Sequence, residues 1–278
     1  MQKSDILITS ATGNVGTPLI HKLHKKNIEY TAATRQADLA HENIPGILET
    51  VHLDFMDPGS FVPALKHKKL LFLCGPSATP GADQLLLPLV SEAKNQGVKH
   101  IVFIASYPNV MEAIEQSGMD YTFIRANFFM QNFEMYQTHD IRDKDQIFLP
   151  VGKGKAPFIH ARDIGEVAAE VIADPEPYKG ETLYITGPES MDHFQAADVF
   201  SDVLDRKITF ENPDDETYRK VMKERGKPKE YIDAMIAVFG KIKQGKVDKV
   251  SNTVEKVLNR KPMTLKEYVE EMKAQFTP

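Results

Sequence analysis

Residues Ile6 to Leu23 constrain the fold of this chain more than any other stretch. Strand-like residues at its start run into a turn of small residues that ends at Gly13. The turn opens onto apolar residues at Val15, Leu19 and Leu23, and a spacing of four puts these three side chains on one helical face. The stretch therefore predicts a strand, a tight turn and a helix, which together open a βαβ unit.

The predicted turn has the chemistry of a phosphate-binding loop. The amides of the first helical turn and the positive end of the helix dipole would both face a bound anion. Gly13 and Gly16 keep side chains out of the way of that anion. A strand-to-helix turn without a ligand would carry the same signal, so both interpretations stay open. The candidate contacts are Ser10, Thr12, Gly13, Asn14, Val15 and Gly16.

The composition is that of an ordinary globular protein. Apolar residues make up 42% and charged residues 26% of the chain, and the net charge of -5 argues against nucleic-acid binding. A single cysteine, Cys74, excludes an internal disulfide and fits a reducing compartment. We find no signal-peptide core and no run as long as a membrane span. We therefore expect a cytoplasmic protein that contacts neither nucleic acid nor membrane.

Strand and helix patterns alternate through the first half of the chain. The segment from Asp83 to Gln96 has apolar residues at helical spacing and stops at Gly97, a residue type that commonly ends helices. Such alternation predicts an α/β fold with a doubly wound parallel sheet of the Rossmann type. The expected strands after the first are Ile28 to Thr34, Glu49 to Leu53, Lys69 to Cys74, His100 to Ser106 and Tyr121 to Arg125.

Ligands of such sheets bind outside the carboxyl ends of the strands, so the residues directly after each strand are of interest. Arg35 follows the second strand, where an NAD-specific protein would be expected to place an acidic residue. A planar cation suits the 2′-phosphate of NADP, so Arg35 predicts a preference for NADPH, with a solvated surface arginine as the alternative. The other candidates after strands are Cys74, Gly75 and Pro76, and, toward the nicotinamide, Ala105, Ser106 and Tyr107.

Four motifs in a fixed order give the chain a family resemblance. Ser-Ala-Thr-Gly-Asn-Val-Gly at 10–16 resembles the Gly-Ala-Thr-Gly-Asn-Val-Gly fingerprint of NmrA-like proteins, a branch of the atypical short-chain dehydrogenase/reductases. Tyr121 to Phe133 is similar to the family's Tyr-Thr-x-x-Arg-Pro-x-x-Phe-Met-x-Asn segment, with Ala126 in place of proline. Ala161 to Ala169 resembles the family's Asp-Ile-x-x-Val-Ala helix, and Tyr184 to Glu189 resembles its seventh strand and exit.

The resemblance implies an NADP(H)-binding domain and a smaller, mainly helical C-terminal domain. It also implies that Asp54 and Phe55 lie beside the adenine, although an aspartate is equally common as a turn former. Ser10 stands where the family has its first glycine, and its Cβ puts the tightness of the turn in question. The expected division is 1–130 with 157–187 for the dinucleotide-binding domain, and 188–278 with 131–156 for the substrate domain.

The C-terminal part has a different pattern. Apolar spacing predicts a helix from Phe194 to Leu204 and a short strand at Ile208 to Phe210, followed by charged helices that end in Leu265 to Phe276. The lysines between Lys220 and Lys249 are mixed with acidic residues, which is typical of solvated helix faces.

The chain lacks the proton-transfer pair of ordinary short-chain dehydrogenases. Those enzymes use Tyr-x-x-x-Lys, in which the lysine lowers the pKa of the tyrosine. No tyrosine of this sequence is followed four residues later by a lysine, and the residue four after Tyr107 is Met111. Interconversion of alcohols and ketones is therefore disfavoured, whereas hydride transfer to an acceptor that spreads the arriving charge remains open. No catalytic residue can be named from the sequence.

Two functions follow from this pattern. The first is an NADPH-preferring oxidoreductase that reduces a quinone, a cationic dye or a similar conjugated acceptor, for which Phe133 and Tyr136 would extend an aromatic wall. The second is a redox sensor that binds NADP(H) without turnover and signals to a protein partner. The aromatic residues can equally be core. The substrate candidates are Asn127, Phe128, Phe129 and Asn132, with Gln131 as a further polar contact.

We expect no metal site, because His21 and His24 lie beside lysines on the polar side of the first helix. The sequence does not identify the physiological acceptor. It also leaves open whether the protein forms a homodimer and what effect the short segment after Ser106 has.

Overall fold

The computed structural model describes residues 4–36, 49–76 and 81–278, which form two compact units. The described residues of the first unit are 4–36, 49–76, 81–126 and 161–184. The second comprises Asn127–His160 and Ile185–Pro278. The chain therefore passes between the units after residues 126, 160 and 184.

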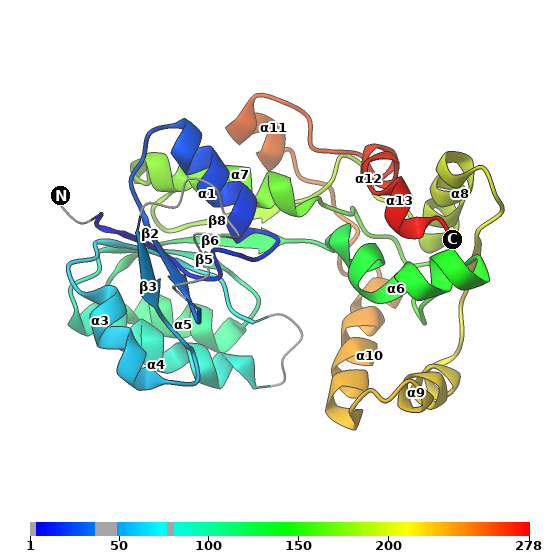
Figure 1. Ribbon diagram of the computed structural model, residues 1–278, viewed down its shortest axis with the longest axis horizontal. Coiled ribbons are helices and arrows are strands. Elements are labelled where there is room, and N and C mark those ends of the chain that lie inside the picture. Colours follow the sequence, from blue (N-terminus) through cyan, green and yellow to red (C-terminus); the bar gives the residue numbers. More distant parts are fainter. Residues whose placement is uncertain (1–3, 37–48, 77–80) are drawn as a thin grey trace. The chain divides into compact units, whose positions relative to one another are not determined.

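The first unit is built on a seven-stranded sheet with the order β3-β2-β1-β4-β5-β6-β8 (Figure 1). The five neighbouring pairs from β3 to β6 are parallel. The strand order reverses at β1 and β4, so the carboxyl ends of these two strands form the switch point at which doubly wound sheets bind ligands. The predicted α/β fold is confirmed. The strands are β1 (Ile6–Ile8), β2 (Thr31–Thr34), β3 (Thr50–His52), β4 (Leu70–Leu73), β5 (His100–Ile104), β6 (Asp120–Ala126) and β8 (Glu181–Ile185).

Helices cover both faces of this sheet. α1 and α7 pack together on one face, and α3, α4 and α5 lie on the other (Figure 1). Since both faces are covered, the central strand β4 is buried along its whole length and reads Leu-Leu-Phe-Leu without polar alternation. The predicted apolar face of α1, at Val15, Leu19 and Leu23, is buried. The helices are α1 (Gly16–Lys25), α3 (Phe61–Leu65), α4 (Ala82–Asn95), α5 (Pro108–Ser117) and α7 (Ala161–Ala173).

Four of the expected strands, β2 to β5, are shorter than predicted, and β2 differs most. The sequence predicts a strand from Ile28, but β2 begins at Thr31. Asn27 has a φ of 55°, and the Ile28 N–H donates to the Leu23 carbonyl at 3.0 Å. The residues after α1 therefore complete its helical end before the chain extends, because the carbonyls of the last turn need partners.

The second unit is mainly helical. Its core is aromatic, with Phe200, Tyr268 and Phe276 fully buried. Side chains begin two of its helices in reciprocal capping boxes, through Asp192 and Thr264. The helices are α6 (Gln131–Lys144), α8 (His193–Leu204), α9 (Asp215–Glu224), α10 (Lys229–Lys243), α11 (Thr253–Leu258), α12 (Leu265–Glu271) and α13 (Lys273–Phe276).

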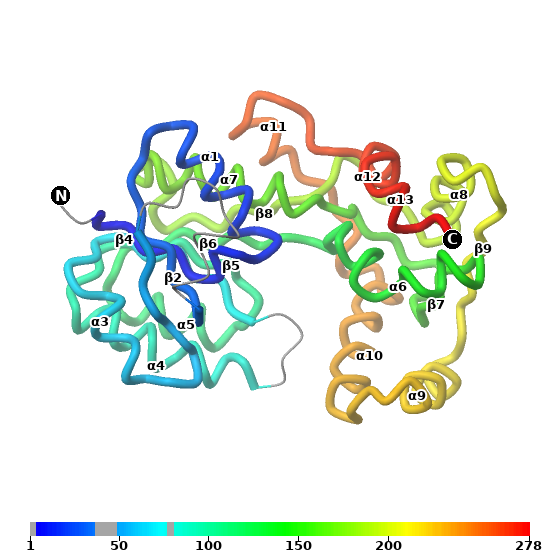
Figure 2. The backbone as a smooth tube through the Cα atoms, in the orientation of Figure 1, coloured from blue at the N-terminus to red at the C-terminus, as the bar shows by residue number. Residues whose placement is uncertain are grey.

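A two-stranded parallel sheet also belongs to the second unit. β7 (Gln146–Phe148) pairs with β9 (Thr209–Glu211), and the two run side by side in the backbone trace (Figure 2). β9 lies one residue later than the strand predicted at Ile208 to Phe210, and β7 was not predicted from the sequence. Three-residue strands are too short to show an alternating pattern. Among the described residues, none of the helices combines the length and the apolar character that crossing a membrane requires.

Candidate functional site

The turn after β1 closes at Ser10, whose φ of 52° places it in the left-handed region. That conformation is unfavourable for a residue with a Cβ. The Ser10 hydroxyl donates a hydrogen bond of 2.8 Å to the Cys74 carbonyl at the end of β4, and the hydroxyl of buried Thr9 accepts from the Cys74 N–H at 2.9 Å. The Gly13 N–H donates to the Ser10 carbonyl at 2.9 Å. Serine therefore makes the tight turn and also joins β1 to β4 at the switch point.

The start of α1 has no room for side chains. A Cβ on Gly16 would lie 2.1 Å from the Ser10 carbonyl oxygen and 2.8 Å from the Ala11 Cα, and a Cβ on Gly13 would lie 3.2 Å from the same oxygen. No side chain caps α1 at Val15, and its first turn holds no acidic residue. The positive end of the helix dipole is therefore not neutralised by the side chains of α1 itself.

α7 holds α1 in place. A Cβ on Gly165 of α7 would lie 2.6 Å from the Val15 carbonyl oxygen, so the two helices meet backbone to backbone at the start of α1. At the other end of α1, Glu170 forms ion pairs with Lys22 at 3.5 Å and with Lys26 at 2.7 Å. Contacts at both ends fix the helix whose first turn forms the candidate loop.

The exits of β4 and β5 are tied together. The Tyr107 hydroxyl donates to the Pro76 carbonyl at 3.1 Å. Burial raises the pKa of the Cys74 thiol to about 12, so this cysteine stays protonated and is a poor nucleophile. A Cβ on Gly75 would lie 2.8 Å from the Leu86 side chain, so packing of α4 by itself accounts for this glycine.

Tyr107 is not tuned for proton transfer. Burial raises the pKa of its hydroxyl, and the negative charge of Asp83 raises it further. A lowered pKa would be needed for a proton donor and acceptor near neutral pH. The neighbouring Ala105 and Ser106 hold the exit of β5 through backbone hydrogen bonds to Ile124 and Ile104, at 2.9 Å and 3.0 Å.

Arg35 is exposed directly after β2. Its carbonyl accepts a hydrogen bond of 3.1 Å from His52 Nδ1. The guanidinium makes no hydrogen bond or ion pair with another residue in the part of the chain that the structure describes. It is therefore available to a ligand at this edge of the sheet.

The adenine candidates Asp54 and Phe55 follow β3. The Asp54 Oδ1 accepts from the Met56 N–H at 2.9 Å, so this side chain does form the turn that the alternative interpretation expects. Phe55 is half-buried against the core of the first unit.

All fifteen cofactor candidates lie in the first unit, after the carboxyl ends of β1 to β5. The glycine cradle at Gly13 and Gly16, the uncapped start of α1 and the exposed guanidinium of Arg35 all suit the phosphates of a dinucleotide. The residues present therefore fit the phosphates of an NAD(P)H cofactor.

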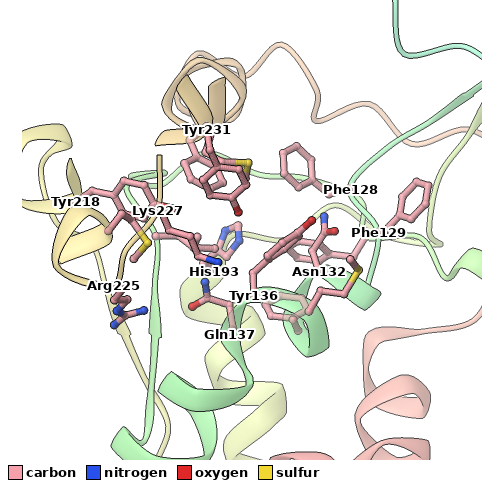
Figure 3. A pocket seen from close by; sticks show the side chains of 17 residues that line it. Phe128, Phe129, Asn132, Tyr136, Gln137, His193, Tyr218, Arg225, Lys227 and Tyr231 are labelled. Atoms are coloured by element: carbon pink, nitrogen blue, oxygen red, sulfur yellow. The ribbon is translucent and has the colours of Figure 1, made fainter. Parts of the chain in front are cut away.

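A pocket of about 120 Å³ lies wholly within the second unit (Figure 3). Engineered cavities of about 150 Å³ hold a single benzene ring. The walls of the pocket in this protein are mostly aromatic rings and methionine side chains. The lining residues are Phe128, Phe129, Asn132, Phe133, Met135, Tyr136, Gln137, Leu149, Phe158, His193, Tyr218, Met222, Arg225, Lys227, Tyr231, Met235 and Phe239.

Three of the four substrate candidates, Phe128, Phe129 and Asn132, line this pocket. Asn127 does not. Its Nδ2 donates to the Val247 carbonyl at 2.8 Å, and its Oδ1 accepts from the Phe128 N–H at 2.8 Å, so its amide holds the backbone. Phe133 belongs to both the wall and the core, because it is 3% exposed and packs against Phe158 at 5.2 Å between ring centroids.

His193 is buried among aromatic rings at the pocket wall. Its ring centroid lies 5.3 Å from that of Phe158 and 5.4 Å from that of Phe210, and only 2% of the residue is exposed. Its Nδ1 has no hydrogen-bond partner within the described residues. Burial lowers the pKa of His193 to about 4, so the imidazole is neutral at neutral pH.

The tyrosines of the pocket are also neutral. Burial raises the pKa of the Tyr136, Tyr218 and Tyr231 hydroxyls. The hydroxyls stay protonated and can donate hydrogen bonds, but none has the lowered pKa of a proton-transfer tyrosine.

About half of the pocket wall comes from α8 to α10 and was not predicted from the sequence. The described pocket residues absent from the prediction include His193, Tyr218, Met222, Tyr231 and Met235. One signal was present: Tyr218 and Met222, and again Tyr231 and Met235, are four residues apart and share one helical face. That spacing looks like an ordinary core face until a second helix is known to oppose it.

Two family models match the chain. A model described as "NmrA-like family" matches residues 105–269, and one described as "NAD(P)H-binding" matches residues 10–112. The NAD(P)H azoreductase of Xenophilus azovorans is 29% identical over 286 residues, which cover 98% of this chain and 99% of that protein.

Solved structures share the fold. The NADPH-dependent quinone oxidoreductase of Escherichia coli, complexed with NADPH, superposes with a TM-score of 0.87 at 21% identity, covering 96% of this chain and 99% of that one. The triphenylmethane reductase of Citrobacter sp., complexed with NADP(H), superposes with a TM-score of 0.81 at 21% identity and the same coverage.

Proposed function

Since the chain belongs to the NmrA-like family, we propose that it is an NADPH-preferring oxidoreductase that transfers hydride to a quinone or a similar conjugated acceptor. In this proposal the first unit binds NADP(H) and the second unit binds the acceptor. The match to an NAD(P)H-binding model over residues 10–112 supports the first part. The similarity to an azoreductase over almost the whole chain supports the second.

The residues that would hold the dinucleotide follow from the strand exits. The loop from Ser10 to Gly16 and the start of α1 would bind the pyrophosphate, and Arg35 the 2′-phosphate. Asp54 and Phe55 would border the adenine. The exits of β4 and β5, at 74–76 and 105–107, would border the nicotinamide side.

The acceptor would be held by aromatic walls. NADPH, when bound, supplies a hydride, and a quinone that takes this hydride and one solvent proton becomes the hydroquinone. Flat rings such as Phe128 and Tyr136 would stack on a conjugated acceptor and exclude water. The neutral hydroxyls of Tyr136, Tyr218 and Tyr231 would donate hydrogen bonds to its oxygens. The observation that carries this proposal is the combination of flat aromatic walls with titratable groups that are held neutral.

The proposal is tested by following NADPH consumption with a panel of quinones and azo compounds, beside calorimetric titrations of NADPH and NADH. We expect NADPH consumption that depends on the acceptor and stops when the acceptor is left out. Tight binding of NADPH without consumption on any acceptor would contradict the oxidoreductase and leave a nucleotide-binding regulator.

Arg35→Glu tests the cofactor preference separately. The variant replaces the cation expected beside the 2′-phosphate by an anion, so we expect its Kd for NADPH to rise about 100-fold. The Kd for NADH, which lacks this phosphate, should change by less than about threefold. Calorimetric titration of both nucleotides measures the two effects.

Lys99→Glu is the matched control for Arg35→Glu. It makes the same change of charge at an exposed residue of the first unit. Lys99 comes directly before β5, so it lies at the amino-terminal ends of the strands, opposite the candidate site. Its affinities should equal those of the parent protein. Equal losses of NADPH and NADH affinity in Arg35→Glu would remove Arg35 from the phosphate site.

A further inference from the structure

The charged groups of the pocket have one sign. Among the described residues that line it, Arg225 and Lys227 are cations and none is an aspartate or a glutamate. The two cations lie on the same side of the pocket, where α9 ends (Figure 3). The rest of the lining is aromatic, thioether, aliphatic, amide or neutral imidazole. An aromatic ligand in this pocket therefore meets positive charge and no negative charge from the lining itself.

Arg225 is already neutralised. Its guanidinium donates two hydrogen bonds to Asp140 of α6, at 2.6 Å and 2.8 Å. Asp140 is 1% exposed and also lies 3.4 Å from the Lys144 ammonium. A bidentate pair with a buried carboxylate holds the guanidinium in one position and cancels most of its charge. Arg225 therefore shapes the wall more than it attracts an anion.

Lys227 keeps its charge. The side chain is exposed, and its ammonium lies 5.6 Å from the centroid of the Tyr231 ring, which also lines the pocket. Within the part of the chain that the structure describes, its ammonium has no ion pair with a carboxylate. A cation over an aromatic face is attracted to it but stays charged.

The backbone fixes the position of Lys227. Gly226 has a φ of 75°, its N–H donates to the Lys223 carbonyl at 2.9 Å, and the Lys227 N–H donates to the Met222 carbonyl at 3.0 Å. This pair of bonds is a Schellman motif, which ends α9. Pro228 then follows and starts α10. The charge is thus placed at the pocket by the helix end, although the side chain is long.

We propose that Lys227 makes this pocket selective for aromatic acceptors that carry an anionic group, such as a sulfonate or a carboxylate. That the bound compound accepts a hydride rests on the proposed function. The preference for binding an anionic ring rests on the pocket alone. Cationic dyes, which are possible acceptors on the sequence alone, would be disfavoured by the same charge. Lys227 is thereby assigned a role in specificity, while the aromatic walls serve anionic and neutral rings alike.

Calorimetric titration with two one-ring probes, phenol and benzenesulfonate, tests the preference without requiring turnover. For the parent protein we expect the sulfonate to bind about fivefold more tightly than phenol, because an ion pair with an exposed lysine contributes only modestly to affinity. Lys227→Gln should make the two affinities equal to within about twofold, and Lys227→Glu should reverse their order. The affinity for phenol should change less than the affinity for benzenesulfonate.

Lys223→Glu is the matched control, because Lys223 is exposed on the last turn of α9 and does not line the pocket. Its ratio of affinities should stay that of the parent protein. Equal affinities of the two probes in the parent, or the same change of ratio in Lys223→Glu as in Lys227→Glu, would overturn the inference. Failure of NADPH consumption would instead refute the proposed oxidoreductase, so the two failures are distinguishable.

Discussion

Gly16→Ala is expected to lose NADPH and NADH binding together, with a rise in Kd of at least about 100-fold for each. The new Cβ would lie 2.1 Å from the Ser10 carbonyl oxygen, so either the turn or the start of α1 must shift. Ser10 cannot give way easily, because its hydroxyl is bonded to the Cys74 carbonyl. The amides that would face the pyrophosphate are therefore displaced. Calorimetric titration measures the loss, and far-UV circular dichroism checks that the variant folds.

Alanine substitutions at two further glycines should raise the nucleotide Kd less than Gly16→Ala does. A Cβ on Gly13 would lie 3.2 Å from the same oxygen, so Gly13→Ala should raise the Kd less, by roughly tenfold. A Cβ on Gly240 of α10 would meet nothing within 4 Å, so Gly240→Ala should leave the Kd unchanged. Gly240→Ala should also raise stability by about 0.5–1 kcal/mol, because alanine favours a helix interior. A Gly16→Ala protein that bound both nucleotides like the parent would exclude this turn as the phosphate site.

His193 should make the protein acid-sensitive. Its pKa falls from an ordinary 6.5 to about 4 on folding. Below pH 6.5 the unfolded chain therefore binds a proton that the folded protein does not accept until about pH 4. The free energy of unfolding should decrease as the pH is lowered from 6.5 to about 4, and should change no further below pH 4 because of this residue. The total loss from this residue is about 3 kcal/mol. His193→Phe should remove this part of the dependence, as measured by urea unfolding at several pH values.

His193→Phe should not destabilise the protein at pH 7, where the imidazole is neutral. The wild-type Nδ1 is buried without a partner in the described part of the chain, so phenylalanine should leave the stability unchanged or raise it by about 1 kcal/mol. His24→Gln, at an exposed position of α1, controls for removing a histidine as such. If His193→Phe kept the full acid sensitivity of the parent, the effect would belong to another group, such as His100, whose pKa burial also lowers.

The sheet could be predicted because its signals are local. The segment from Ile6 to Leu23 contains a strand, a turn and the apolar face of α1 in consecutive residues, and all three apolar positions of that face are buried. Strand β4 carries its own signal as a run of four apolar residues. The residues that follow these strands were the candidates for cofactor binding, and they all lie after the carboxyl ends of the strands of the first unit.

The pocket could be predicted only in part because its walls are far apart in sequence. Phe128 and Phe133 belong to a motif that the family resemblance exposes, whereas Tyr218 and Tyr231 lie on helices that were read as charged and solvated. The pair of Asp140 and Arg225 joins residues 85 positions apart, and no local pattern connects them. Short helices and three-residue strands add little periodicity of their own, so tertiary contacts decide where they lie.

The division of the chain also sets an order for folding during synthesis. Every segment of the first unit has left the ribosome soon after Tyr184 is added, but the core of the second unit includes Phe276, which is fully buried against Phe200 and Tyr268. The sheet can therefore form while the second unit still lacks part of its core. A nucleotide that binds the first unit would stabilise this incomplete chain by mass action. Protease protection of ribosome-bound chains that end near residue 220, with and without NADPH, would show whether it does so.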